Sequence, residues 1–147
     1  MARLTDSSTQ KFSVLIQLLD RRLLRPFYTH SHYGLSPLQI NVLLLLSGNA
    51  SPSMSQIATR LDISKPNVTP IIDRLIQDGY AVRTANEKDR RIINITATEK
   101  GKKLISTIRS DMRKMLQERF SSHSEAEFDA FMSAIDTCIK FLETMDE

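Results

Sequence analysis

The sequence has little of what marks secreted and membrane-bound proteins. Its single cysteine, Cys138, cannot form an internal disulfide. The first ten residues, MARLTDSSTQ, are polar and contain no apolar segment of the kind found in secretory signals. The longest apolar run, Val42 to Leu46, is far shorter than the ~20 residues that cross a bilayer. These absences exclude a disulfide scaffold, predict no membrane span and favour a cytoplasmic protein.

Glycine and proline are also scarce, with 4 and 5 residues respectively among 147. This scarcity excludes collagen-like and low-complexity chains. Hydrophobic residues make up 41% and charged residues 25% of the sequence, as in globular proteins. A chain of this length can bury about 70% of its unfolded surface in one domain. We therefore expect a single domain over residues 1–147 that folds without a metal or a disulfide.

The residue patterns of enzymes are missing as well. We find no Ser-His-Asp set, no Gly-rich phosphate loop and no carboxylate pair in a motif context. His30, His32 and Tyr33 form a small polar cluster, but only His123 remains elsewhere, which is too few ligands for a metal site. The sequence thus predicts neither catalysis nor a bound metal or cofactor, and it leaves the role of the cluster open.

The net charge of +3 is unevenly distributed along the chain. Residues 1–53 carry 5 basic and 2 acidic side chains, residues 54–103 carry 10 and 6, and residues 104–147 carry 5 and 9. A basic middle segment suggests contact with a polyanion, whereas the acidic C-terminal segment must serve another purpose.

Three capping boxes mark helix starts, because in each a Ser hydroxyl can accept a helical N–H while Gln or Glu reaches back to the cap. They begin at Ser36, Ser53 and Ser124, and each opens an apolar pattern of helical period. Thr98 caps a further long helix. The complete pattern predicts a mainly α fold with a small β-hairpin, comprising helices at 8–31, 37–47, 54–61, 65–78, 99–120 and 124–146 and strands at 80–85 and 92–97.

The long helices at both ends carry more apolar surface than the short helices and the hairpin can cover. Residues 8–31 and 104–146 both have apolar stripes of helical period. Such a surplus is most often covered by a second copy of the chain in a two-fold arrangement. We therefore expect these segments to be dimerisation helices.

A helix-turn-helix is predicted where residues 56–61 are followed by Asp62-Ile63-Ser64 and a new helix. In that second helix Ile71, Ile72 and Leu75 face inward, which leaves a polar first turn. Free N–H groups and polar side chains at a helix start suit phosphates and base edges in a DNA major groove. The alternative is a surface helix whose polar turn only caps and solubilises it. The polar residues concerned are Ser64, Lys65, Asn67 and Thr69.

The hairpin connector, residues 86–91, holds Lys88, Arg90 and Arg91. A narrow basic loop beside a recognition helix can enter the adjacent minor groove, whose potential attracts Arg. The alternative is a solvated charged turn.

Six short segments in the middle of the chain follow a characteristic order. They are Leu61-Asp62-Ile63-Ser64, Asn67-Val68-Thr69, Asp73-Arg74-Leu75, Asp78-Gly79-Tyr80-Ala81-Val82-Arg83, Asp89-Arg90-Arg91 and Ala97-Thr98-Glu99-Lys100-Gly101. Together they resemble the winged helix-turn-helix of the MarR (multiple antibiotic resistance regulator) family of transcription factors. The Asp-x-Arg of the wing, at this distance from the Gly and Arg of the first strand, is the most distinctive part of the match.

The resemblance implies a DNA-binding lobe at residues 36–98 and a homodimeric transcriptional regulator, most simply a repressor, on a pseudo-palindromic operator. It also implies a possible small aromatic or anionic effector between the dimer helices and the winged lobes. The alternative function is a winged-helix scaffold that binds proteins and not DNA. The implied DNA contacts are Ser64, Lys65, Asn67, Val68 and Thr69 in the major groove, Lys88, Arg90 and Arg91 in the wing with Asp89 holding it by pairing with a nearby Arg, and Ser53, Ser55 and Arg74 on phosphates.

Two residues complicate this interpretation. Pro70 lies six residues past the Ser64 cap, where it removes one helical hydrogen bond and should kink the helix. Alternatively, Thr69 caps a helix that starts at Pro70.

Cys138 falls on an apolar stripe between Ile135 and Leu142, which favours a core or interface position over a redox sensor. A small-molecule effector is therefore preferred to a thiol switch.

Overall fold

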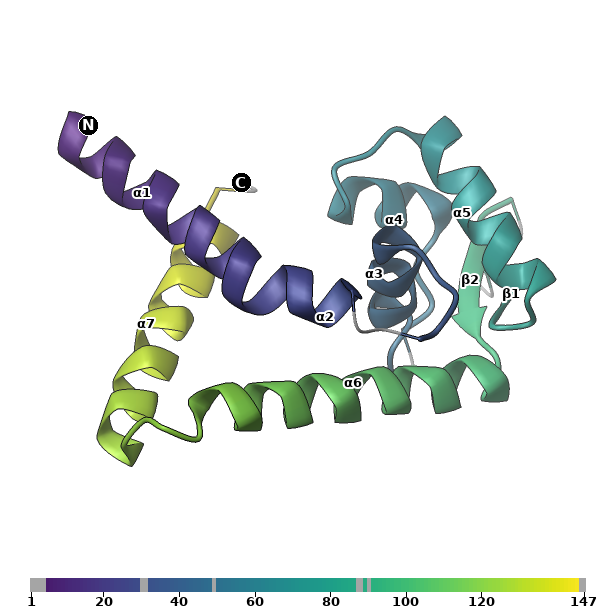
Figure 1. The fold of residues 1–147 in the computed structure, drawn as a ribbon. Coiled ribbons are helices and arrows are strands. Elements are labelled where there is room, and N and C mark those ends of the chain that lie inside the picture. Colours follow the sequence, from purple (N-terminus) through teal and green to yellow (C-terminus); the bar gives the residue numbers. More distant parts are fainter. Residues whose placement is uncertain (1–4, 30–31, 49, 87–88, 90, 146–147) are drawn as a thin grey trace. The chain divides into compact units, whose positions relative to one another are not determined.

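The computed structural model describes residues 5–29, 32–48, 50–86, 89 and 91–145. The chain forms two compact units, Met1–Asp111 and Met112–Glu147, which are described separately. The first unit contains the winged lobe, and the second contains the end of α6 and all of α7 (Figure 1). The elements are α1 (Asp6–Leu19), the π-helix η1 (Asp20–Leu24), α2 (Arg25–Thr29), α3 (Pro37–Leu45), α4 (Met54–Arg60), α5 (Lys65–Gln77), β1 (Ala81–Ala85), β2 (Ile93–Ala97), α6 (Glu99–Phe120) and α7 (Glu125–Glu143). The predicted mainly α fold with a small hairpin is confirmed.

The N-terminal helix is less regular than its apolar pattern suggests. Thr5 caps α1, and its hydroxyl accepts a hydrogen bond from the Ser8 N–H at 3.2 Å. Between α1 and α2 the helix widens into η1, where the Arg25 N–H donates to the carbonyl of Asp20, five residues earlier. The expected single helix at 8–31 therefore contains a π-helical turn, which the hydrophobic period alone does not reveal.

The three predicted capping boxes are all present. The Ser36, Ser53 and Ser124 hydroxyls each accept the backbone N–H three residues on, at 3.3 Å. In return, Gln39, Gln56 and Glu127 accept the N–H of the capping serine at 2.8–2.9 Å. Because these contacts are local, they fix the starts of α3, α4 and α7 where the sequence places them.

One hydrophobic core holds the winged lobe together. α3, α4 and α5 each bury one face in it, and the hairpin and α6 close it. Burying a large aliphatic side chain contributes roughly 1.5–3 kcal/mol, so this core orients α5 within the lobe. Its buried members are Val42, Leu43, Leu46, Ile57, Ala58, Val68, Ile72, Leu75, Ala81, Ile95 and Ile105.

The hairpin is antiparallel and pairs Ala81 with Ala97 and Ala85 with Ile93. A third segment lies on the other side of β2, where the Pro52 carbonyl accepts the Ile95 N–H at 2.9 Å and Ser53 forms an isolated bridge with Asn94. The base of the wing is thus paired along both edges of β2.

The start of α6 passes very close to the start of the hairpin. Thr98 caps α6 by accepting the Gly101 N–H at 3.0 Å, and its hydroxyl donates to the Gly79 carbonyl at 2.7 Å. A Cβ added at Gly101 would collide with the backbone oxygen of Tyr80. Only glycine therefore fits at this crossing.

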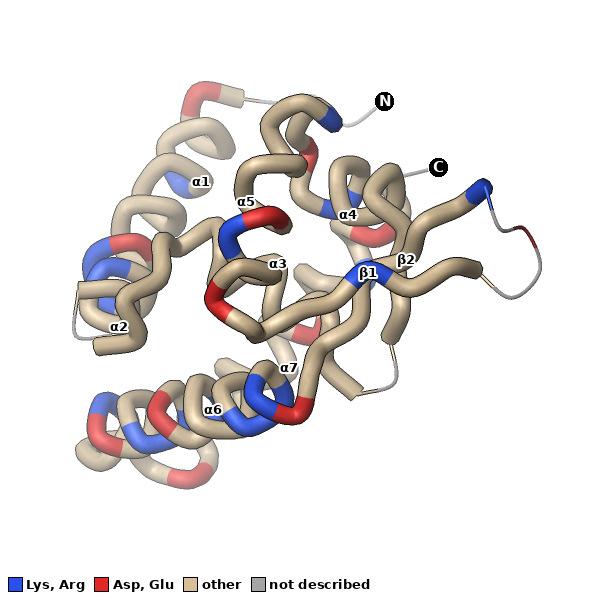
Figure 2. The backbone as a smooth tube through the Cα atoms, turned by 90° about the vertical axis from the view of Figure 1, so that its right-hand side faces the viewer, with Lys and Arg blue, Asp and Glu red and all other residues tan. Residues whose placement is uncertain are grey.

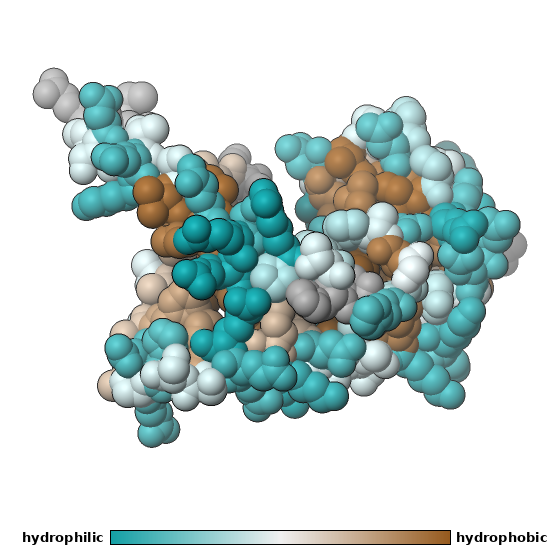
Figure 3. Space-filling view, in the orientation of Figure 1, coloured by the Kyte–Doolittle hydropathy of each residue, from teal (hydrophilic) through white to brown (hydrophobic). Residues whose placement is uncertain are grey.

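The helices at the two ends of the chain contrast with the lobe. Neither α1 nor α7 has a buried residue, and Figure 3 shows hydrophobic residues exposed along α1. Phe12 of α1 and Phe141 of α7 are 62% and 66% exposed. In the second unit the Phe120 ring packs against Phe128 and Phe131 at centroid distances of 5.6 and 5.4 Å. No described helix is long and apolar enough to cross a membrane.

Candidate nucleic-acid interface

A tight turn between α4 and α5 sets the position of α5. Asp62 adopts a left-handed conformation with φ of 49°. The Ile63 N–H donates to the Ala58 carbonyl at 3.0 Å, and the Asp62 N–H donates to Thr59 at 3.1 Å. This pair of bonds is a Schellman closure, which usually has glycine where Asp62 stands. The predicted helix-turn-helix is therefore present, with a strained aspartate at its turn.

The polar first turn of α5 is exposed as predicted, except at one position. Lys65, Asn67 and Thr69 are exposed, and the Thr69 hydroxyl donates to the Lys65 carbonyl at 3.2 Å. Val68 is fully buried in the core, so the expectation that its side chain faces the major groove is wrong. Residue 68 lies on the same helical face as Ile72, four residues later, and burial of that face determines its direction.

Ser64 is the N-cap of α5, with φ of −67° and ψ of 148°. Its exposed hydroxyl makes no capping hydrogen bond within the described chain. The Ser64 hydroxyl is therefore not used in capping α5 and stays available to an external partner at the helix start.

Pro70 lies inside α5, which runs from Lys65 to Gln77 without interruption. The alternative in which the helix begins at Pro70 is therefore wrong. Because Pro70 has no N–H, the Pro66 carbonyl loses its usual partner four residues on. The exposed position of Pro70 leaves that carbonyl on the solvent side of the helix.

The residues expected to contact phosphates have different surroundings. Ser55 is exposed, whereas Ser53 is half-buried and holds its capping box. Arg74 is exposed but pairs through Nε with Asp78 at 3.0 Å. Ser55 is thus the most open of the three.

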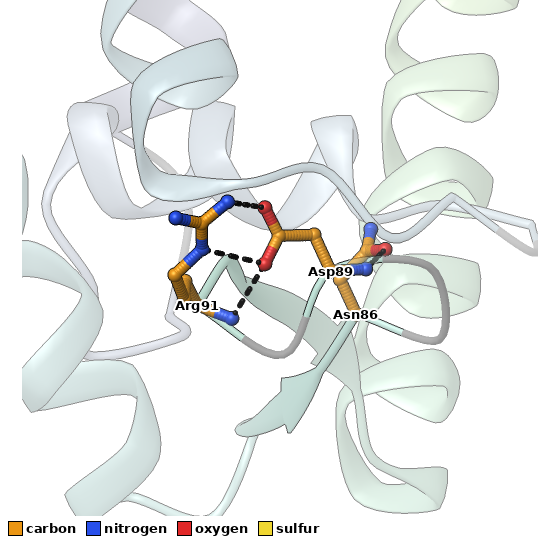
Figure 4. Close-up of polar contacts among 3 residues, drawn as sticks. All are labelled: Asn86, Asp89 and Arg91. Atoms are coloured by element: carbon orange, nitrogen blue, oxygen red, sulfur yellow. Dashed lines mark hydrogen bonds and ion pairs between the residues drawn. The ribbon is translucent and has the colours of Figure 1, made fainter.

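The wing holds one arginine in a defined direction. The Arg91 side chain is 92% exposed, and its Nε and Nη2 donate to the two carboxylate oxygens of Asp89, each at 3.1 Å (Figure 4). The Arg91 N–H adds a third bond at 3.0 Å. The hydrogen bonds from the Arg91 side chain, and then from its backbone, hold the pKa of the Asp89 carboxyl below its ordinary value. Lys88 and Arg90, also expected at the wing, lie outside the described residues.

An ion pair ties the hairpin to α5, and sequence reasoning missed it. Arg83 Nη2 of β1 lies 2.6 Å from Asp73 Oδ1 of α5. Both residues belong to segments that carry the family resemblance. The ten-residue separation of Asp73 and Arg83, however, does not predict that the two side chains form an ion pair. Figure 2 shows the basic positions on α5 and on the hairpin.

The polar cluster near the first helices has a structural partner on α6. The Tyr33 hydroxyl donates to Asp111 Oδ2 at 2.6 Å. Burial, followed by the hydrogen bond to Asp111 and its charge, raises the pKa of Tyr33 to about 12. His32 is exposed, and His30 lies outside the described residues. Within the described ranges, no group of three or more His, Cys, Asp or Glu side chains could hold a metal ion.

Cys138 lies on α7 and is exposed. The expectation of a core position within the chain is therefore wrong, because α7 buries no residue of its own. A position in an interface between two copies stays a prediction.

Comparison with known proteins identifies the family. The sequence model of the MarR family matches residues 33–92, from just before α3 into the wing. The transcriptional regulator MhqR of Bacillus subtilis is 30% identical over 127 residues, which cover 86% of this chain and 87% of MhqR. The chain belongs to the MarR family. The repressor MdtR of the same organism is 40% identical over 68 residues, but this match spans only 46% of the chain and 44% of MdtR.

A solved MarR-like fold extends the match to nearly the whole chain. The crystal structure of Streptococcus pneumoniae FabT in complex with DNA has a TM-score of 0.76 and 19% sequence identity. It covers 93% of this chain and 98% of the FabT chain. The likeness in fold therefore includes the terminal helices.

Proposed function

We propose that this MarR-family protein is a homodimer that binds a pseudo-palindromic operator in double-stranded DNA and represses transcription. As a family member it is a DNA-binding transcriptional regulator. One observation carries the proposed binding mode. The lobe exposes the polar first turn of α5 and, on the wing, an Arg91 side chain that Asp89 holds in place.

We assign the first turn of α5 to the major groove and Arg91 to the minor groove. Asn pairs well with adenine and Lys with guanine in the major groove, while Thr contacts either base or a thymine methyl. A protein-binding scaffold has no need of a guanidinium held outward on its wing. Ser64, Lys65, Asn67 and Thr69 are the proposed groove residues, with Arg91 at the wing and Ser53, Ser55 and Arg74 on phosphates.

The apolar faces of α1 and α7 support dimerisation. Exposed large hydrophobic residues recur along both helices, including Ile16 and Leu142. A two-fold dimer would present its two α5 helices about one DNA turn apart, ~34 Å or 10 base pairs. Within the same proposal, a small aromatic or anionic effector that prefers a different separation of the lobes would release DNA.

Selection of bound DNA from a random pool, followed by gel shifts at about 0.15 M salt, tests the function. Arg91→Ala should weaken binding to every selected sequence and reduce the salt slope by up to about one. Asn67→Ala should change base preference by about 1–3 kcal/mol at one position. Lys103→Ala, which removes an exposed basic side chain outside both the DNA-binding lobe and the dimerisation segments, is the control and should bind as the parent does. Failure of the parent to select any DNA would favour the protein-binding scaffold.

A further inference from the structure

Both ends of α3 are tied to the same turn of α6. Before α3, the Tyr33 hydroxyl donates to Asp111 Oδ2 at 2.6 Å. After α3, Arg109 Nη2 donates to the Ser47 Oγ at 2.9 Å. These hydrogen bonds join residues 78 and 62 positions apart in the sequence, and their α6 partners are only two residues apart.

Apart from these two hydrogen bonds, α6 meets the lobe through few fully buried side chains. α6 contributes only Ile105 and Ile108 as buried large side chains. Apolar burial is non-directional, whereas hydrogen bonds require defined distances and angles. The two polar ties therefore restrict rotation of α3 about α6 in a way that the core does not.

Any rotation of α3 would carry the recognition helix with it. Leu43 and Leu46, from α3 and its C-cap, share the core with Val68 and Ile72 of α5. Close-packed side chains of this kind transmit displacement. Asp111 is the last residue of the first unit, and α6 continues beyond it into the second unit. The two hydrogen bonds thus lie on α6 just before this helix passes from the first unit into the second.

We propose that Tyr33 and Asp111, together with Ser47 and Arg109, are positioning residues that fix the lobe on α6 and so determine which half-site spacing the dimer accepts. This inference rests on the proposed dimeric binding of a pseudo-palindrome. None of the four residues needs to touch DNA. They act by restricting the distance between the two α5 helices of the dimer to a narrow range. Operators whose half-sites are spaced differently are therefore bound more weakly. The Tyr33 hydroxyl is protonated at neutral pH, as any tyrosine is, and so acts as the donor to Asp111.

The experiment uses an operator selected by the parent from a random DNA pool, and derivatives with one or two base pairs inserted or deleted between the half-sites. Affinities are measured by fluorescence anisotropy with the full-length protein. The readout is spacing discrimination, defined as the ratio of the dissociation constants for the altered and the selected operator. Tyr33→Phe should lower this ratio by at least about tenfold, the lower end of the range expected for one hydrogen bond to a charged acceptor.

Three further variants separate positioning from general stability. Asp111→Asn keeps an acceptor oxygen and should retain most of the discrimination, whereas Asp111→Ala should lose it. Tyr33→Phe combined with Asp111→Ala should be no worse than either alone, because both remove the same contact. Tyr80→Phe is the matched control, because it removes a tyrosine hydroxyl of the lobe for which the described residues show no hydrogen bond, and it keeps the ring that Lys100 contacts. It should leave the discrimination unchanged.

The possible outcomes are distinct. A lower melting temperature with unchanged discrimination in Tyr33→Phe would show a merely structural contact and overturn the proposal. Should Tyr33→Phe fail to fold, Ser47→Ala breaks the other tie at the end of α3 and must lower the discrimination. A parent that selects palindromic DNA but tolerates every spacing would overturn this inference alone. A parent that selects no DNA would overturn the proposed function as well.

Discussion

The winged lobe and the terminal helices are both amphipathic, yet they differ in what covers their apolar faces. In the lobe, Ile72 and Leu75 of α5 are fully buried among side chains of the same chain. In α1 and α7, Phe12 and Phe141 point apolar rings into solvent. The same hydrophobic period therefore corresponds to a buried core in the winged lobe and to a solvent-exposed apolar surface in the terminal helices. Periodicity predicts a helix, but it does not tell which molecule supplies the opposing face.

The largest effect on operator affinity is expected when a charged side chain is introduced on the apolar face of a terminal helix. Ile16→Glu places a carboxylate on the exposed apolar stripe of α1. Burying that carboxylate unpaired in an interface would cost several kcal/mol, so the protein should sediment as a monomer. Loss of two-site binding should then reduce operator affinity by at least about 100-fold. Gln10→Glu, on the opposite side of α1, should stay dimeric. A dimeric Ile16→Glu variant would contradict the assignment of α1 to the interface.

In the winged lobe, the largest loss of stability is expected where the start of α6 crosses the start of the hairpin. Gly101→Ala forces a methyl group against the Tyr80 carbonyl, so the unfolding free energy should fall by about 3 kcal/mol. Gly48→Ala is the control, because a Cβ at Gly48 meets no atom within 4 Å and only its φ of 69° is unfavourable. That variant should lose about 1 kcal/mol. Denaturant titration measures both, and equal losses would mean that the crossing relaxes.

A smaller, stabilising change is available at the turn of the helix-turn-helix. Asp62→Gly places the residue favoured by a left-handed conformation at φ of 49°. The unfolding free energy should rise by roughly 0.5–1 kcal/mol, while operator affinity stays within about twofold of the parent value. Asp62→Ala keeps the strain and loses only the carboxylate, so it should not be stabilised. If both variants gained equally, the effect would come from charge and not from backbone conformation.

The smallest effect is expected at Cys138, on the exposed terminal helix α7. A sensor thiol needs a nearby positive charge, and the residues three and four positions before and after Cys138 on α7, which share its helical face, are uncharged. Cys138→Ser should therefore leave operator affinity unchanged, and peroxide should affect parent and variant alike. Peroxide-driven release of the parent, but not of the serine variant, would establish a thiol switch in place of a small-molecule effector.

Sequence patterns whose partners lie within a few residues of each other predicted the secondary structure reliably. The capping serines Ser36, Ser53 and Ser124 predict helix starts because their partners lie three residues away. Val68 could have been placed in the core from its four-residue spacing to Ile72, but its polar neighbours concealed that signal.

The remaining contacts depend on tertiary structure. The Arg83–Asp73 ion pair and the Tyr33–Asp111 hydrogen bond form only after the hairpin and α6 have packed against the lobe. No single-sequence pattern encodes either. The exposed polar first turn of α5 could therefore be predicted from local sequence, but the contacts that position α5 could not.

The pairing of Pro52 and Ser53 with β2 has a consequence for solubility. Exposed strand edges invite other chains to add a strand, which is a common route to aggregation. In the described hairpin this segment covers one edge of the sheet, and only β1 keeps an open edge. β1 is five residues long and carries Arg83, which is engaged by Asp73 on the adjacent helix. A short edge strand with a fixed charge is a poor template for strand addition, so the hairpin does not favour edge-to-edge association between copies of the protein.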